Sequence, residues 1–331
     1  MNFHLLLAAL LLTFFGTFLG CALATWLWTR FVLSYLIRKD ILDHPGERSS
    51  HDRPTPRGGG IAVTGVTVAS WIGLAWWVGE TEAVIVPVLL ALGLAWLSWQ
   101  DDQKSLSAGV RFLAHTVAAG LAVSLMPHSG EVFQGLLPPF LDQVVSVLLL
   151  VWFINLFNFM DGIDGISGVE TLTIGLGLAF SGASGGLFGL AIAGAALGFL
   201  ILNWHPARIF LGDVGSVPLG LLLGWLLLQA AAEGYWVIAL ILPLYYLADA
   251  TITLLKRLVR GEAVWKPHRQ HFYQRAHQAG LSHNRIMRRI GAANALLLLL
   301  ALVSPGHEAL ALVLAIMVVA GLLFALQTAK P

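Results

Sequence analysis

Three groups of acidic residues, each at the end of an apolar run, are the side chains best suited to chemistry. They are Asp101 with Asp102, Asp161 with Asp164, and Asp213. Neighbouring carboxylates repel one another and favour a nearby cation. Magnesium binds through one or two carboxylates together with waters and substrate phosphates. The acidic groups therefore predict a magnesium site that handles a phosphorylated substrate. A solvated loop face is the alternative, and it explains one such group more easily than three.

Glycines accompany two of these groups. The sequence reads Asn-Phe-Met-Asp-Gly-Ile-Asp-Gly at 158–165 and Asn-Trp-His-Pro-Ala-Arg-Ile-Phe-Leu-Gly-Asp at 203–213. Because glycine has no side chain, its backbone can approach a ligand closely. A third glycine run, 58–60, follows the basic segment 38–58 and begins a predicted helix. Its N–H groups would suit a phosphate, although no Gly-Lys-Ser/Thr follows as in a P-loop.

The longest polar segment, 256–289, is rich in arginine, lysine and histidine. Its histidines are His268, His271, His277 and His283. Positive charge suits anionic lipid head groups and a phosphorylated substrate, and it also marks cytoplasmic loops. A zinc site is the weaker alternative, because the pair His268 and His271 has no cysteine or glutamate at ligand spacing.

The elements that must position these residues are membrane helices. Of the 331 residues, 57% are hydrophobic and 11% charged, the net charge is +1 and the mean hydropathy is +0.79. This composition excludes an ordinary soluble enzyme, a disordered chain and a nucleic-acid-binding protein. It predicts an all-α, polytopic membrane protein with eleven helices, or ten if the sixth and seventh runs merge. The apolar runs are 5–28, 60–79, 83–99, 112–126, 142–159, 171–182, 187–202, 217–232, 235–255, 290–303 and 309–326.

The basic residues are sorted to one side of these helices. All nineteen Lys and Arg lie in or beside the connections 29–59, 100–111, 160–170, 203–216 and 256–289 or the C-terminus. The positive-inside rule places this set in the cytoplasm, with the N-terminus outside and the C-terminus inside. We expect one transmembrane catalytic domain, 1–331. Its active site would be formed by the cytoplasmic loops 38–58, 100–111, 160–170, 203–216 and 256–289.

Three features of the apolar runs have simple explanations. Cys21, the single cysteine, is expected to be a small buried side chain. Gly194 and Gly198 predict close helix packing. Asp249, inside the ninth run, is expected to pair with a lysine or arginine at the membrane edge, such as Lys256.

Taken in order, the loops resemble those of the polyprenyl-phosphate N-acetylhexosamine-1-phosphate transferases, glycosyltransferase family 4. The matching motifs are Asp-Asp-x-x-Lys at 101–104, Asn-x-x-Asp-Gly-x-Asp-Gly at 158–165 and Asn-x-x-Pro-Ala-x-x-Phe-x-Gly-Asp at 203–213. The segment 48–60 is similar to the O-antigen-initiating branch. The resemblance implies transfer of N-acetylhexosamine-1-phosphate from a UDP-sugar to undecaprenyl phosphate, releasing UMP. It also implies Mg²⁺ as cofactor, Mn²⁺ as a substitute, and a bacterial inner membrane location with the site facing the cytoplasm.

Roles for individual residues follow from the resemblance. Asp213 would bind magnesium, with Asp102 as a second ligand. Asp101 and Asp102 would position the lipid phosphate, one of them as a candidate base or as a residue that supports the metal from outside its ligand set. His268 and His271 depart from the family's His-x-His-His motif, so their separate catalytic roles stay open. The substrate-binding residues would be Lys104, Asn158, Asp161, Asp164, Asn203, Phe210, Gly212 and Arg269.

The chemistry of two anionic reactants agrees with this interpretation. The lipid phosphate must approach the β-phosphoryl group of the UDP-sugar in line, so the catalyst has to neutralise repulsion and align the groups. Direct displacement is favoured over a covalent aspartyl intermediate. A transporter or flippase for an anionic lipid or sugar is the alternative function, but its charges belong inside helices. The sugar (GlcNAc, FucNAc, QuiNAc or GalNAc), the polysaccharide pathway and a homodimeric state are left open.

Overall fold

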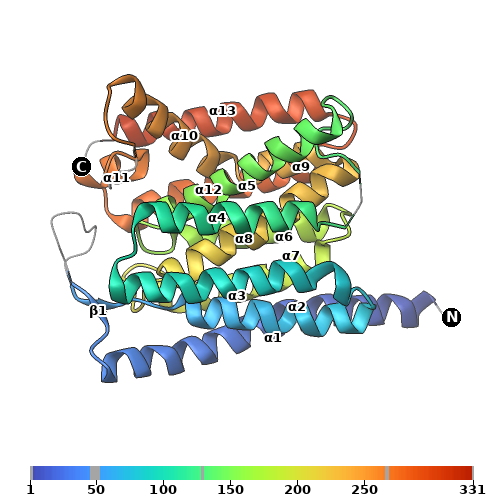
Figure 1. Ribbon diagram of the computed structural model, residues 1–331, viewed down its shortest axis with the longest axis horizontal. Coiled ribbons are helices and arrows are strands. Elements are labelled where there is room, and N and C mark those ends of the chain that lie inside the picture. Colours follow the sequence, from blue (N-terminus) through green and yellow to red (C-terminus); the bar gives the residue numbers. More distant parts are fainter. Residues whose placement is uncertain (1–2, 45–52, 128–129, 265–267, 330–331) are drawn as a thin grey trace.

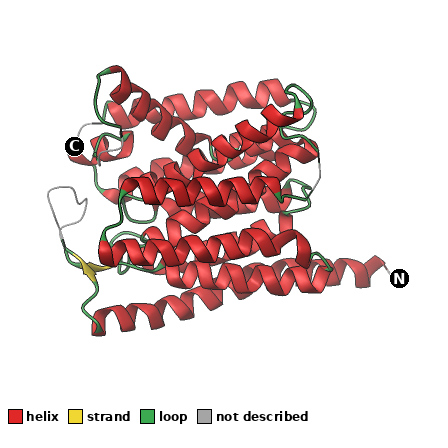
Figure 2. Ribbon diagram, in the orientation of Figure 1, coloured by secondary structure: helices red, strands yellow, loops and turns green. Residues whose placement is uncertain are grey.

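The protein is a bundle of helices that run side by side (Figure 1). The computed structural model describes residues 3–44, 53–127, 130–264 and 268–329. Within them, the strands β1 (Leu42–Asp43) and β2 (Thr55–Pro56) form a small antiparallel ladder, and almost everything else regular is helical (Figure 2). The N-terminal and C-terminal ends lie at opposite ends of the bundle (Figure 1). This placement agrees with the predicted termini on opposite sides of the membrane.

Each predicted apolar run overlaps at least one helix of the described structure. Among the described residues, seven helical stretches are long and apolar enough to cross a membrane, and α4 and α6 are shorter apolar helices. The prediction of an all-α polytopic membrane protein is therefore confirmed, while the count of eleven crossings stays a prediction. The helices are α1 (Phe3–Arg38), α2 (Gly60–Val78), α3 (Thr81–Lys104), α4 (Ala108–Ser124), α5 (Pro139–Met160), α6 (Ile166–Phe180), α7 (Gly186–Asn203), α8 (Asp213–Ala230), α9 (Trp236–Ile241), α10 (Leu244–Val259), α11 (Phe272–Gln278), α12 (His283–Leu302) and α13 (Glu308–Gln327).

The ninth run, 235–255, is not the single helix that its hydropathy predicts. A π-helical segment, η1 (Ala231–Tyr235), joins α8 to α9, and Gly234 turns the chain there with φ 95°. Pro243 then separates α9 from α10. Proline has no N–H to donate and its ring obstructs the preceding turn, so a helix ends or bends there.

The helices differ in how deeply they are buried in the bundle. Every residue from Val214 to Ala230 of α8 is buried, which makes α8 the central helix. α7 packs closely on α1, because a Cβ on Gly194 or Gly198 would collide with the backbone of α1. These two glycines thus serve the predicted close packing. Cys21, also at this contact, is buried, and its Sγ lies 3.1 Å from Ser70 Oγ.

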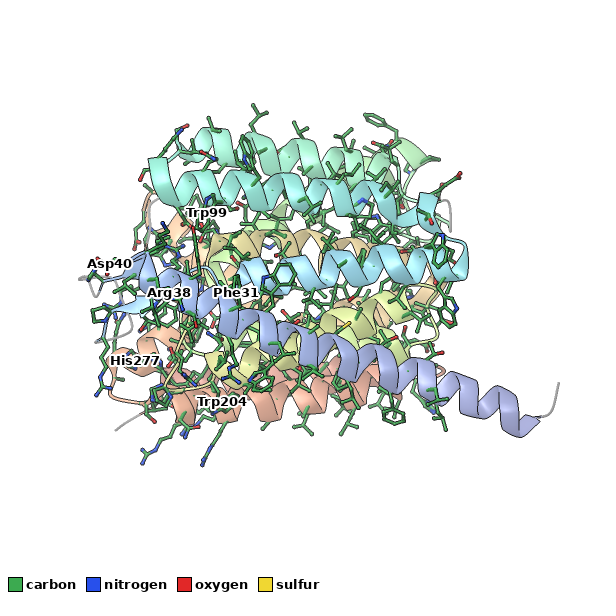
Figure 3. The ribbon with its side chains drawn as sticks, turned by 90° about the horizontal axis from the view of Figure 1, so that it is seen from below. Phe31, Arg38, Asp40, Trp99, Trp204 and His277 are labelled. Carbon is green, nitrogen blue, oxygen red and sulfur yellow. The ribbon has the colours of Figure 1, made fainter. Side chains whose placement is uncertain are left out.

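Most of the predicted cytoplasmic loops meet at one end of the bundle. β1 and α11 lie at this end (Figure 1). Figure 3 shows Arg38, Asp40 and His277 gathered there, away from the N-terminal end of α1. The bundle therefore brings together segments that are far apart in sequence, at the end where the acidic motifs also lie.

Candidate active site

A polar cleft of about 230 Å³ opens at this end of the bundle. Carboxylates, an arginine and backbone segments make up its wall. The wall includes Asp43, Arg57, Asp161, Asp164, Phe210 and Asp213. The sequence motifs at 158–165 and 203–213 therefore meet at one cavity.

Arg57 joins two of the predicted metal ligands. Its Nη2 donates to Asp213 Oδ1 at 2.5 Å and lies 3.6 Å from Asp102 Oδ1. Burial by itself would lower the pKa of Arg57, but the charges of Asp213 and Asp102 outweigh it and raise this pKa. Two carboxylates thus converge on one guanidinium group. Their negative charges favour a cation at this point of the cleft.

Backbone pairing positions Arg57. Phe210 N–H donates to Pro56 O at 2.8 Å, and Gly58 and Gly59 N–H both donate to Phe210 O. Gly60 N–H donates to Leu211 O at 2.8 Å. The prediction that this glycine run cradles a phosphate is therefore wrong, because all three N–H groups already bond to the chain. The run permits close packing instead: a Cβ on Gly60 would collide with the backbone of Gly215, in the first turn of α8.

Asp213 is the first residue of α8, and its neighbours hold it toward the cleft. Asn158 Nδ2 lies 3.5 Å from Asp213 Oδ2, and Asn158 Oδ1 accepts a hydrogen bond from Ser216 Oγ at 2.7 Å. Gly212 precedes α8 with φ 73°, a value that favours glycine. A Cβ there would also lie 3.1 Å from Arg57 Cγ. The asparagine, the glycine and the aspartate are therefore one connected unit.

Asp101 and Asp102 have different surroundings. Asp101 Oδ1 accepts from Leu106 N–H at 2.6 Å, and Oδ2 accepts from Arg111 Nη1 at 3.0 Å. These bonds tie the end of α3 to α4. Asp102 faces Arg57 instead, while Lys104 is exposed at the last turn of α3. The geometry thus favours Asp102 over Asp101 as the carboxylate that meets a ligand.

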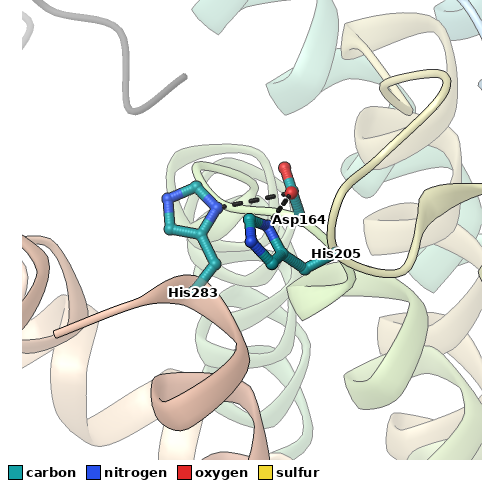
Figure 4. A group of neighbouring side chains, drawn as sticks. All are labelled: Asp164, His205 and His283. Carbon is teal, nitrogen blue, oxygen red and sulfur yellow. Dashed lines mark hydrogen bonds and ion pairs between the residues drawn. The ribbon is translucent and has the colours of Figure 1, made fainter. Parts of the chain in front are cut away.

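Asp161 and Asp164 lie on the same short turn yet differ in charge state. Burial raises the pKa of Asp161 to about 6. Burial also opposes ionisation of Asp164, but contacts with His283 and His205 and a backbone bond from Ala207 N–H lower its pKa to about 2. In Figure 4, dashed lines join this carboxylate to both imidazoles. Asp164 therefore keeps its charge at neutral pH, and Asp161 loses its charge in mild acid.

Asn203 and Phe210 lie in the cleft wall as well. Asn203 Oδ1 accepts from Gly165 N–H at 3.0 Å, and its Nδ2 donates to Ile209 O at 2.9 Å. The amide thus fastens the start of α6 to the α7–α8 connection, and Phe210 is bound into the same connection by its backbone. Asn203 therefore has a structural role here, and its substrate-binding role stays a prediction.

The structure does not bring the predicted histidines into this cleft. His268, Arg269 and His271 are absent from its described wall, where Gln274 and His283 lie instead. Burial and the neighbouring charges of His271 and Arg257 lower the pKa of His268 to about 4. The predicted catalytic roles of both histidines and the substrate role of Arg269 therefore lack support from this geometry.

His271 is bound to Asp249 from α10. Its Nδ1 lies 3.1 Å from Asp249 Oδ1, and Phe272 N–H donates to the same oxygen at 3.0 Å. Tyr245 OH and Thr253 Oγ1 also donate to the Asp249 carboxylate, each at 3.3 Å. The expectation that Asp249 pairs with a lysine or arginine is wrong, because the chain folds back and supplies the start of α11 instead.

Besides Asp43 of the cleft wall, four residues of the site were not selected from the sequence. Arg57 stood in a basic segment that drew notice, but its partners Asp102 and Asp213 are distant in sequence. His205 and Gln274 carried no separate signal, and His283 was one histidine among several in 256–289. Only the folded arrangement relates these side chains to the acidic motifs.

The donor set beside Arg57 fits a hard divalent cation. Asp102 and Asp213 supply carboxylate oxygens that converge on one point, and the Asn158 amide lies beside them. Magnesium prefers such oxygen ligands and keeps positions for waters and substrate phosphates. The residues present therefore suit the metal that the motifs predict.

Fold and cleft together define a polytopic membrane protein with a charged cleft at one end of its bundle, an arrangement suited to phosphorylated substrates at a membrane surface. The family model of Glycosyl transferase family 4 matches residues 84–231. That segment contains the three acidic motifs, from α3 to the end of α8.

Curated bacterial proteins extend the similarity over most of the chain. A decaprenyl-phosphate N-acetylglucosaminephosphotransferase of Mycolicibacterium smegmatis is 31% identical over 317 residues, covering 81% of this chain and 76% of the relative. A probable undecaprenyl-phosphate N-acetylglucosaminyl 1-phosphate transferase of Bacillus subtilis is 28% identical, covering 77% and 75%. An undecaprenyl-phosphate α-N-acetylglucosaminyl 1-phosphate transferase of Yersinia pestis is 28% identical, covering 81% and 78%. The chain belongs to glycosyl transferase family 4, among the polyprenyl-phosphate hexosamine-1-phosphate transferases.

Proposed function

We propose that this protein transfers an N-acetylhexosamine-1-phosphate from a UDP-sugar to undecaprenyl phosphate, releasing UMP. The proposal includes the O-antigen or a related envelope polysaccharide as the product pathway, and the cytoplasmic face of the inner membrane as the location. The names of the relatives support a polyprenyl-phosphate acceptor and an N-acetylglucosamine-1-phosphate donor group. The whole chain would act as one catalytic domain.

The observation that carries the proposal is the convergence of Asp102 and Asp213 on Arg57, where Arg57 and Asp213 line the polar cleft. Transfer between two phosphorylated anions needs positive charge that is fixed in place before the reactants arrive. Arg57 supplies a fixed positive charge, and the two carboxylates suit a magnesium ion. When bound, magnesium would neutralise phosphate oxygens of the donor.

The remaining residues would bind and orient the reactants. In the proposal, Asp161, Asn203 and Phe210 receive the nucleoside part of the donor, since they line one wall of the cleft. Asp102 positions the lipid phosphate, which is already largely ionised at neutral pH and needs no strong base. The phosphate oxygen forms the new bond to the β-phosphorus as the bond from this phosphorus to the UMP oxygen breaks. Direct displacement thus requires alignment and charge neutralisation more than proton transfer.

The transporter alternative gains no support from the placement of charge. Among the described residues, the two buried acidic side chains of helix interiors, Glu170 and Asp249, both have partners within the bundle: Asn294 Nδ2 lies 2.7 Å from Glu170, and Asp249 accepts from α11. A translocation path would require ionisable groups facing a passage. The concentration of charge at the cleft favours the enzyme.

A purified-enzyme assay tests the proposal. The chain is reconstituted with undecaprenyl phosphate and Mg²⁺ and offered UDP-GlcNAc, UDP-GalNAc, UDP-FucNAc and UDP-QuiNAc in turn, with UMP release and the lipid product measured. We expect UMP with at least one of these sugars, no release in excess EDTA, and recovery with Mg²⁺ or Mn²⁺. Absence of UMP with the whole panel would refute the reaction, and turnover in EDTA would refute the metal requirement.

A further inference from the structure

A second cluster of ligand atoms includes two residues of the cleft wall and is separate from the Asp102–Arg57–Asp213 group. It comprises Asp164, His205 and His283 (Figure 4). The side chain of His283 is only 5% exposed, and neither of its ring nitrogens makes a hydrogen bond within the described structure. Buried polar groups in folded proteins nearly always have a partner. The imidazole of His283, whose Nδ1 has only the long approach of 3.4 Å to Asp164 and whose Nε2 has no partner, can therefore hold a further ligand.

The three side chains are arranged around one point. His205 Nδ1 lies 2.6 Å from Asp164 Oδ2, and His283 Nδ1 lies 3.4 Å from the same oxygen. One ligand atom from each residue can be chosen so that all three lie within 4.8 Å of one another. Ligands about 2.1 Å from a tetrahedral ion stand roughly 3.4 Å apart. The His283–Asp164 distance already has this value, and the exposed ring of His205 has room to adjust.

The chemistry of the donors separates this cluster from the magnesium ligands. Two imidazoles and one carboxylate suit zinc and similar transition metals, whereas magnesium and calcium prefer oxygen ligands. Three protein ligands would leave a fourth position open toward solvent or substrate. The nitrogen-rich and oxygen-rich groups of this cleft therefore favour different ions.

We propose that Asp164, His205 and His283 form a second metal site, which takes Zn²⁺ or a chemically similar divalent transition metal. The ligands come from the α5–α6 turn, the α7–α8 connection and the first residue of α12. A metal ion there would fasten α12 to the two segments that carry the acidic motifs. The site would thereby fix one wall of the cleft, and it does not depend on the proposed transfer reaction.

The test uses Co²⁺ as a spectroscopic probe and Zn²⁺ as a competitor. Tag-free, full-length protein in detergent is stripped with chelator, exchanged into chelator-free buffer and titrated with Co²⁺ in the absence of magnesium and substrates. We expect one Co²⁺ per chain with the visible absorption of a low-symmetry, four-coordinate site, and its loss when Zn²⁺ is added. Zn²⁺ should also raise the thermal unfolding temperature, since a ligand that binds the folded state stabilises it.

Variants locate the ion. His205→Ala removes an exposed ligand without disturbing the core, and His283→Gln keeps a polar side chain in the buried position. Loss of an outer partner of a metal site costs 10–100-fold in affinity, so each variant should weaken Co²⁺ binding by about 100-fold or more. His307→Ala, a histidine at the opposite end of the bundle, should bind as the unaltered protein does.

Two outcomes would overturn the site. One is unaltered Co²⁺ affinity in both His205→Ala and His283→Gln. The other is loss of the absorption in Asp213→Asn with retention in the histidine variants, which would place the ion among the oxygen ligands. Since these readouts need no substrate, failure of the transferase assay and failure of this proposal are distinguishable.

Discussion

The carboxylates Asp213 and Asp249 are both held by cationic or N–H donors, yet their surroundings differ in kind. Asp213 lines an open cleft, and its partners Arg57 and Asn158 are themselves at the cleft wall or beside it. Asp249 is fully buried and accepts from four donors, two of them at the start of α11. Asp213 can therefore still contact a ligand, whereas the hydrogen bonds that Asp249 accepts all stabilise the fold.

The same difference between binding a ligand and stabilising the fold applies to the basic segment 256–289. Its charge suggested a surface that receives phosphates, but several of its side chains close the loop on itself. Arg257 donates to Glu262 Oε2 and to Ala263 O, each at 2.9 Å, and is nearly buried. Lys256 lies 4.6 Å from the ring centroid of Phe272. The acidic residues of the cleft are thus placed to bind a ligand, whereas much of this basic segment stabilises its own loop.

The substitution Asp213→Asn is the most direct test of the difference between Asp213 and Asp249. Loss of one fixed charge at a phosphoryl-transfer site is expected to lower turnover by about 10³-fold, while the folded fraction stays unchanged, because the amide can still accept from Arg57. UMP release and thermal unfolding are measured on the same preparation. Asp142→Asn is the matched control, since Asp142 is buried in the first turn of α5, at the end of that helix away from Asn158, and accepts from Val132 and Phe133 N–H. Equal activity losses in both variants would contradict a special role for Asp213.

The opposite behaviour is expected of Asp249→Ala. Removing one partner of a buried charged group costs about 3–5 kcal/mol, because His271 and Phe272 N–H lose their acceptor. The free energy of unfolding, followed by chemical denaturation in micelles, should fall by this amount. Asp249→Asn should recover part of the loss, since its amide oxygen still accepts from Phe272 N–H. A stable Asp249→Ala protein with abolished turnover would instead assign Asp249 to the chemistry.

The same contrast shows which parts of the site can be predicted from the sequence. Asp102, Asn158 and Asp213 lie at helix ends, where short motifs and apolar runs determine both position and neighbours. Arg57 depends on pairing between the segment before α2 and the segment before α8, which are more than 150 residues apart. No local pattern encodes such pairing.

Local spacing misled the interpretation of Asp249. Lys256 lies two helical turns away in sequence, but the buried face of α10 turns Asp249 inward, and the chain returns 22 residues later with His271. The break inside the ninth run was missed for a related reason. Hydropathy does not distinguish burial in lipid from burial in protein, and it does not report the backbone effect of Pro243.

Titration of Asp161 gives a smaller effect with a definite sign. Its pKa of about 6 lies above the unfolded value of about 3.9, so the folded state binds the proton more tightly. The free energy of unfolding should therefore fall as pH rises from 4 to 6, by about 2 kcal/mol, and level off above that. Asp161→Asn should lack this fall. Asp164 has the opposite shift, and its stabilisation is lost only below about pH 4, so the two carboxylates are separable. A matching fall in the variant would assign the dependence to another group.

The smallest predicted effect compares two arginines. Arg57→Lys keeps a positive charge at the cleft but loses the planar group that reaches both Asp102 and Asp213. Loss of one charged hydrogen bond, about 1.5 kcal/mol, corresponds to roughly a tenfold decrease in kcat/KM, with little change in the free energy of unfolding. Arg257→Lys should show the reverse, because Arg257 holds Glu262 and two backbone carbonyls within the loop. Steady-state kinetics and denaturation of both variants measure the two quantities. If Arg57→Lys unfolds more easily and Arg257→Lys turns over more slowly, the division between a binding end and a supporting loop is wrong.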